Sequence, residues 1–195
     1  MSIVGSTFEK LARKALVKVL QRGDACEVAP DQTLSGKKDI VAVCLNSMRF
    51  TAIMFFVYPR NRDSLSFILG PDAADEVFGE AEQSSGRVDL LSDRYSEIAN
   101  MVVGRMRQDM SEAFKFTGQS TPMMLNVSDV AAHIDRLSAS LRFSFGVSDG
   151  ERQVMTLHSA LYCSDVKSLT FPVQSDVSGE SSRDVESDEG SLELL

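Results

Sequence analysis

The segment Asp93-Arg-Tyr-Ser-Glu97-Ile-Ala-Asn100-Met-Val-Val-Gly104 lies near the middle of the chain. At about 100° per residue, the apolar residues in and around it fall on one side of a helix. These residues are Leu91, Tyr95, Ile98, Val102 and Met106. Asp93, Glu97, Asn100 and Gly104 fall together on the opposite side. The pattern predicts an amphipathic helix at about 89–114 that presents carboxylates, an amide and a glycine outward.

The polar side of this predicted helix differs from an ordinary solvated face, where Lys, Glu and Arg are typical. Asn and Gly each cost a helix about 0.5–1 kcal/mol relative to Ala. Gly104 also removes a side chain, so a large group could come close at that point. An ordinary polar face is the alternative that the residues alone leave open.

The spacing of these polar residues, Asp-x-x-x-Glu-x-x-Asn-x-x-x-Gly, resembles the active-site helix of the CheC/CheX family of chemotaxis phosphatases. The family pattern is Asp or Ser, then ExxN, then xxxG, and all four of its positions are filled here. Thr121-Pro122 matches the Ser/Thr-Pro strand entry of the family, and the likeness spans roughly residues 5–165. Only Asn100, of four asparagines, follows a Glu by three positions, and a single ExxN helix is similar to CheX rather than CheC.

The resemblance implies an α+β, CheC-like fold with an antiparallel sheet backing long helices. It also implies hydrolysis of the aspartyl phosphate on a CheY-type response regulator. In that reaction the catalytic residues would be Asn100, which positions water, and Glu97, which anchors the regulator through a lysine. Asp93 and Gly104 would belong to the partner surface, where Asp93 extends the rim and Gly104 gives backbone clearance.

The resemblance to this family also implies which partners and cofactors the protein would use. The protein would need no cofactor of its own, since the regulator would carry Mg²⁺. CheX proteins form homodimers through their sheets, and the hairpin expected at 137–163 offers strand surface for such a contact. The alternative is a noncatalytic docking module that binds a response regulator or a flagellar-switch component, because the same fold serves structurally in flagellar-switch proteins.

The first half of the chain is predicted to contain a helix, then two strands, then short helices. A helix begins at the capping-box spacing Ser6-x-x-Glu9 and closes at Gly23. Residues 24–38 are polar and predict a loop. Strands are predicted at Asp39–Leu45 and Phe50–Tyr58. Two short helical pieces, separated at Gly70-Pro71, are expected within 63–80, and a loop at 82–86.

The second half of the chain is predicted to be mainly strands after the motif helix. One strand is expected at Ser120–Val127. Strict alternation of apolar residues over 137–147 predicts a half-buried strand, and Asp149-Gly150 predicts the turn into a returning strand that ends near Cys163.

Composition indicates one domain with an acidic extension. The chain has 195 residues, 43% hydrophobic and 25% charged, as is typical of a globular protein. The net charge is −8, and residues 175–195 carry seven acidic side chains against one basic, which leaves −6 there and −2 elsewhere. We therefore predict a CheX-like domain at 1–172 and a disordered, serine-rich tail at 173–195.

Charge and hydropathy exclude several classes of partner. Without a concentrated basic patch, nucleic-acid binding is not expected. Charged residues interrupt the N-terminal apolar positions, and no apolar run could span a bilayer, so we expect a cytoplasmic protein without membrane insertion. The basic side of the N-terminal helix is typical of a solvated face, with a membrane-surface helix as the alternative.

Cysteines and histidines do not form a site in the sequence. Cys26, Cys44 and Cys163 are scattered, and none lies at metal-ligand spacing from His133 or His158. We expect buried, reduced thiols at Cys44 and Cys163, a structural His158 and no metal. The sequence contains no GxSxG, HExxH, Walker-type or dinucleotide glycine pattern.

Overall fold

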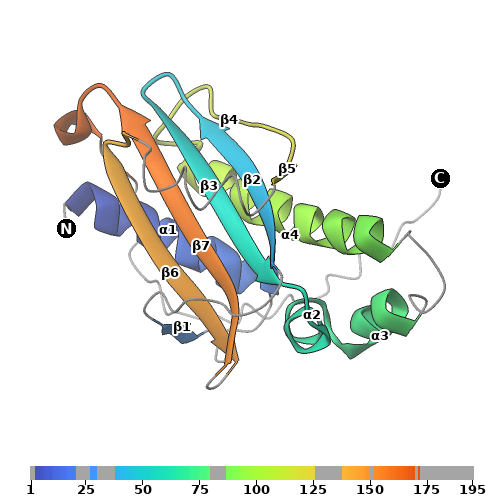
Figure 1. The fold of residues 1–195 in the computed structure, drawn as a ribbon. Coiled ribbons are helices and arrows are strands. Elements are labelled where there is room, and N and C mark those ends of the chain that lie inside the picture. Colours follow the sequence, from blue (N-terminus) through green and yellow to red (C-terminus); the bar gives the residue numbers. More distant parts are fainter. Residues whose placement is uncertain are drawn as a thin grey trace, which may run out of the picture.

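An antiparallel sheet covered on one face by two helices forms the body of the protein (Figure 1). The computed structural model describes residues 3–20, 27–29, 38–79, 87–125, 138–149, 152–169 and 171. Its strands are β1 (Glu27–Ala29), β2 (Lys38–Asn46), β3 (Phe50–Pro59), β4 (Gly118–Gln119), β5 (Met123–Leu125), β6 (Leu141–Asp149) and β7 (Arg152–Cys163). They run in the order β1-β6-β7-β3-β2-β4, with β5 also paired to β2. The predicted α+β class with a backing antiparallel sheet is confirmed.

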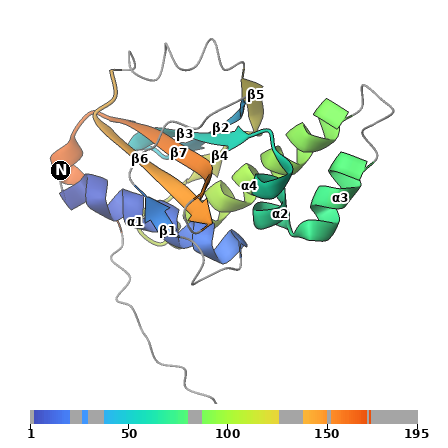
Figure 2. The same cartoon turned by 60° about the horizontal axis from the view of Figure 1, so that its bottom comes forward.

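Two long helices, α1 (Ile3–Leu20) and α4 (Arg87–Met110), lie side by side on one face of the sheet (Figures 1 and 2). Helix α1 contacts β6, and α4 contacts β2 and β3. Two short helices, α2 (Arg62–Leu69) and α3 (Pro71–Gly79), follow β3 and pack together at one end. A 3-10 turn, η2 (Val166–Ser168), follows β7.

The apolar side of the motif helix is buried as its periodicity predicts. Leu91, Tyr95, Ile98, Val102 and Met106 are all at most 5% exposed. They belong to one core cluster with the inward side chains of α1, β2, β3, β6 and β7. The helix spans Arg87–Met110 rather than 89–114, because the chain leaves it in turns that end at Phe116, where φ is +60°.

Several local predictions agree with the structure. The strand pair β2 and β3 and the two helices separated at Gly70-Pro71 occur where expected. Strands β6 and β7 pair antiparallel up to Asp149 and Arg152. Cys44 and Cys163 are free thiols, but both are half-buried rather than fully buried as predicted.

Other boundaries were also wrong, and the strand expected from residue 137 begins only at Leu141. Helix α1 begins at Ile3, so Ser6 lies inside it, and Ser is tolerated in a helix interior at small cost. The loop expected at 24–38 contains β1, which pairs with Gly146–Ser148 of β6. Within the range Ser120–Val127, where one strand was expected, the described strand is only β5, and the short strand β4 lies just before it.

Other predictions concern parts of the chain outside the described residues. These parts are the tail at 173–195, the loop at 82–86, the helix closure at Gly23, the turn residue Gly150, and Cys26 and His133. Among the described residues, no helix combines the length and apolar composition that crossing a bilayer requires.

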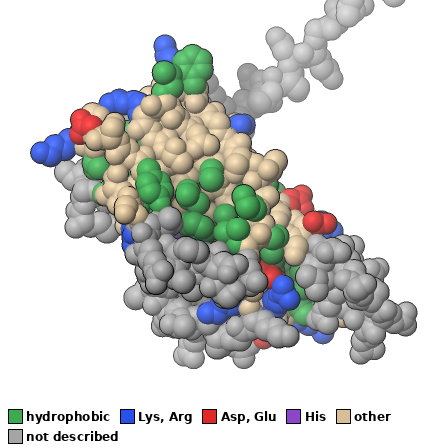
Figure 3. Space-filling view, turned by 45° about the horizontal axis from the view of Figure 1, so that its top comes forward, with side chains coloured by type: hydrophobic (Ala, Val, Ile, Leu, Met, Phe, Trp, Pro, Cys, Tyr) green, Lys and Arg blue, Asp and Glu red, His purple; other side chains and the backbone are tan. Residues whose placement is uncertain are grey.

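The sheet face opposite α1 and α4 carries a smaller apolar cluster of Ile40, Ala42, Phe55 and Val57. Hydrophobic side chains also gather on one surface of the space-filling view (Figure 3). The expected dimer contact through 137–163 stays a prediction. Part of the outer edge of β6 is already paired, because β1 covers its last residues.

Candidate active site

The exposed side of α4 carries the residues that the motif singles out. Asp93, Glu97 and Asn100 are exposed, and Gly104 is half-buried. Their spacing of three and four residues places them along one face of the helix. The buried face of the same helix, centred on Tyr95 and Val102, fixes which way they point.

Helix α4 is held against β3 by a pair of tyrosines. The rings of Tyr58 and Tyr95 stack with centroids 4.1 Å apart and planes within 4°. The Tyr95 hydroxyl donates to the carbonyl of Pro59 at 3.2 Å, and the Tyr58 hydroxyl lies 3.4 Å from the carbonyl of Tyr95. These contacts fix the rotation and height of the helix segment that carries Glu97 and Asn100.

Burial alters the acid–base properties of this tyrosine pair. It raises the pKa values of both Tyr95 and Tyr58. The negative charge of Asp39 further raises the pKa of Tyr95, and Arg60 partly offsets it. Arg60 forms an ion pair with the buried Asp39. The hydrogen bond within this pair raises the pKa of Arg60. The hydroxyls are therefore neutral structural groups.

Glu97 forms a loose ion pair on the helix surface. Its carboxylate lies 3.6 Å from the Arg94 guanidinium, and both side chains are substantially exposed, at 62% and 38%. A solvated pair of this kind contributes little to stability and can exchange partners easily. Glu97 can therefore meet a cation on another molecule.

Asn100 contacts a residue that the motif did not include. Gln119, on β4, donates from Nε2 to the Asn100 side-chain oxygen Oδ1 at 2.6 Å. The same nitrogen lies 3.4 Å from the backbone carbonyl oxygen of Asn100. Sequence reasoning missed Gln119 because nothing in the local pattern links this strand residue to the helix.

The space beside Gly104 is occupied by the same glutamine. A Cβ atom built on Gly104 would lie 3.3 Å from Oε1 and 3.8 Å from Nε2 of Gln119. The missing side chain at Gly104 therefore makes room for a residue of this chain. The expected role of Gly104 in the partner surface stays a prediction.

Other polar groups lie away from this face. His158 of β7 shares a hydrogen bond with Ser144 of β6, Nδ1 to Oγ 2.8 Å, as suits a structural residue. On α1, Arg13 pairs with Glu9 and lies 4.4 Å above the Phe145 ring, so part of the basic side of this helix packs on its own sheet. Within the described residues, no group of three or more His, Cys, Asp and Glu side chains could hold a metal.

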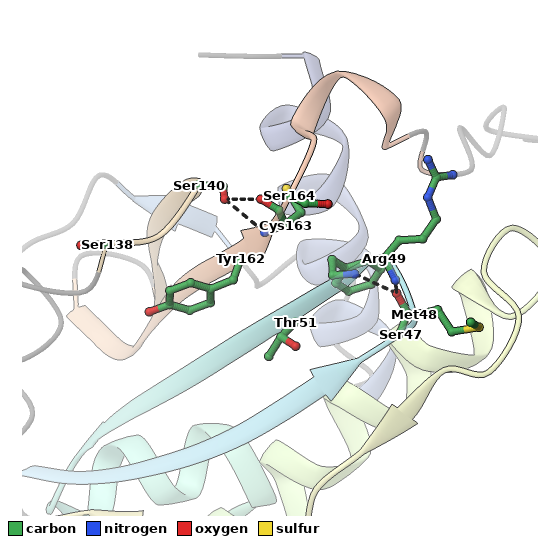
Figure 4. Close-up of a pocket in the computed structure, with 10 residues that line it drawn as sticks. Ser47, Met48, Arg49, Thr51, Ser138, Ser140, Tyr162, Cys163 and Ser164 are labelled. Carbon is green, nitrogen blue, oxygen red and sulfur yellow. Dashed lines mark hydrogen bonds between the residues drawn. The ribbon is translucent and has the colours of Figure 1, made fainter.

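A shallow hollow of about 470 Å³ lies at the tip of the β2–β3 hairpin and the end of β7 (Figure 4). Ser140 ties this region together, because its hydroxyl bonds both the carbonyl and the amide of Cys163, at 3.0 and 3.1 Å. The hollow contains none of the four motif residues.

Comparison with solved structures identifies the class of fold. A CheX–CheY–BeF3–Mg²⁺ complex from Borrelia burgdorferi matches with a TM-score of 0.56 and 13% identity, covering 80% of this chain and 96% of that one. A CheC-like superfamily protein from Shewanella sp. PV-4 matches at 0.54 and 11%, covering 83% and 99%. Chemotaxis protein CheX from Vibrio vulnificus matches at 0.52 and 15%, covering 79% and 95%.

The chain has the CheC-like fold of these chemotaxis proteins, as the residues of the motif helix predicted. No family model and no curated protein matches the sequence.

Proposed function

We propose that this protein is a phosphatase that hydrolyses the aspartyl phosphate of a CheY-type response regulator. The observation that carries the proposal is the joint exposure of Glu97 and Asn100 on one face of a helix whose other face is locked in the core. The structural likeness to a CheX protein in complex with CheY supports a regulator of that type as the partner.

Hydrolysis of an aspartyl phosphate requires few catalytic groups from the phosphatase. An acyl phosphate already has a good leaving group, so a partner need only position a water molecule in line with the phosphorus atom. The carboxamide of Asn100 suits this task, because it can donate and accept hydrogen bonds and carries no charge that would repel a phosphoryl group. A glutamine orients the attacking water in GTPases for the same reason.

Glu97 would hold the regulator rather than act as a base. A carboxylate so near a phosphoryl dianion is repelled by it, whereas a lysine beside the phosphorylation site would attract it. The loose pair with Arg94 can be exchanged for that lysine. Mg²⁺ would be held by the regulator, and Asp93 would extend the contact rim.

The proposal is tested by incubating the full chain with phosphorylated CheY-type regulators from the same cell and measuring both binding and phosphate release. We expect accelerated release from at least one regulator. The matched control is the double variant Glu97→Gln/Asn100→Ala, which should not accelerate release. Binding of a phosphorylated regulator without any acceleration would reject the phosphatase and favour the noncatalytic docking module.

A further inference from the structure

We propose that Gln119 is a positioning residue that holds the carboxamide of Asn100 in one orientation for the reaction. The inference rests on the proposed phosphatase function and adds to it a residue outside the motif helix. It starts from the hydrogen bond of 2.6 Å from Gln119 Nε2 to Asn100 Oδ1.

The backbone of the helix decides which atom of each amide faces the other. The Gln119 atom near Asn100 lies 3.4 Å from the Asn100 backbone carbonyl, which can only accept a hydrogen bond. An amide nitrogen at this position suits the carbonyl, whereas the amide oxygen would face a second acceptor. Because this nitrogen donates, the Asn100 atom that it meets must be the oxygen Oδ1. The backbone carbonyl of Asn100 therefore sets the orientation of both side-chain amides, those of Gln119 and Asn100.

This contact leaves a defined part of Asn100 for other molecules. Gln119 occupies one lone pair of Oδ1, so the second lone pair and both N–H groups of Nδ2 remain. Within the described residues, Asn100 only accepts hydrogen bonds from Gln119, and its Nδ2 donates none. A free asparagine amide rotates, and fixing it before the regulator binds removes an entropic cost from the reacting complex.

Gln119 can fix Asn100 because its own backbone is anchored in the sheet. It pairs with Leu45 of β2. The next residue, Ser120, accepts from the amide of Cys44 through its hydroxyl and donates its own amide to the Cys44 carbonyl, both at 2.9 Å. The glutamine therefore projects from a strand that is bonded at two successive positions.

The far side of the Gln119 amide is tightly confined. Its Oε1 is buried and has no hydrogen-bond partner among the described residues. It lies against Gly104, where a Cβ atom would stand only 3.3 Å away. A buried acceptor without a partner is unfavourable. The confinement of Oε1 beside Gly104 leaves the amide little freedom to rotate, so Nε2 stays turned toward Asn100.

The test uses the full chain and the variant Gln119→Leu, which replaces the amide by an apolar group and so removes the donor. We expect kcat to fall about tenfold, the size of one net hydrogen bond, with KM for the phosphorylated regulator unchanged. The NMR signals of the Asn100 side-chain NH₂ should show a lower order parameter in the free variant. Gln119→Glu should be worse, because a carboxylate accepts from Nδ2 and reverses the amide.

Gln153 provides the matched control. It is also a glutamine on a strand, its Oε1 is also buried without a described partner, and it lies over Gly146, but it bonds Thr156 instead of Asn100. Gln153→Leu should leave kcat unchanged. A normal kcat in Gln119→Leu, or a change in KM alone, would overturn the positioning role. An inactive wild-type protein would instead reject the phosphatase itself, and the positioning role would fall with it.

Discussion

Tyr58 and Tyr95 stack almost parallel, with ring centroids 4.1 Å apart, and so join the central strand β3 to the helix that carries Glu97 and Asn100. Both rings are 0% exposed. The orientation of the exposed motif face therefore depends on an aromatic contact on the other side of the helix. Aromatic pairs of this kind add about 0.5–1.5 kcal/mol beyond the apolar area that they bury.

The tyrosine pair predicts a loss of stability in alkali. Its pKa values are raised in the folded protein, whereas an unfolded tyrosine ionises near pH 10. The contribution of the two neutral tyrosines to the free energy of unfolding is thus complete below about pH 10. It is lost as the pH rises above that value, by about 1.4 kcal/mol per pH unit for each tyrosine. Urea unfolding from pH 8 to 11.5 measures this slope. Tyr95→Phe should make it shallower, and an equal slope in both proteins would contradict the assignment.

Glu97 is predicted to act through charge at the regulator interface. Glu97→Gln should weaken binding and turnover together, and it should reduce the sensitivity of binding to salt. Arg94→Ala is the companion variant. It should leave stability within about 0.5 kcal/mol, because the pair is solvated, and should tighten binding slightly by releasing Glu97. Titration with a phosphorylated regulator gives the affinities, and unchanged affinity in Glu97→Gln would remove its anchoring role.

Gly104→Ala separates two roles for the glycine. Alanine favours a helix by up to about 1 kcal/mol, so stability should be unchanged or higher. Its Cβ would press on Gln119, and kcat should therefore fall while KM stays the same. In a double-mutant cycle, Gly104→Ala should add nothing to Gln119→Leu, because both act through one contact. A raised KM with additive effects would instead indicate clearance for the partner.

The sequence predicts the motif helix well because its signal is local. Apolar residues at positions such as Tyr95 and Val102 recur with the helical period, and burying them leaves Glu97 and Asn100 outside. The hairpin of β6 and β7 is equally local, since neighbouring segments pair with each other. In these elements the pattern of burial and the geometry of the chain agree.

Contacts between distant segments could not be predicted in the same way. Strand β1 has only three residues and exists because it pairs with Gly146–Ser148, more than a hundred positions away. Gln119 reaches Asn100 from 19 residues further along the chain, through a turn and a short strand. Neither feature has a periodic signal, because a single cross-strand or strand-to-helix contact defines it.

In the proposed reaction, Asn100 positions the attacking water. The most direct measurement compares the rate of phosphoryl loss from a saturating phosphorylated regulator with the wild-type protein and with Asn100→Ala. We expect the rate to fall about 100-fold or more, with binding retained and stability changed by less than about 1 kcal/mol. Asn61→Ala is the matched control. Asn61 caps helix α2, because its Oδ1 accepts from the backbone amide of Ser64 at 2.7 Å. Its loss should therefore lower stability without affecting the rate. A near-normal rate in Asn100→Ala would show that Asn100 does not position the water.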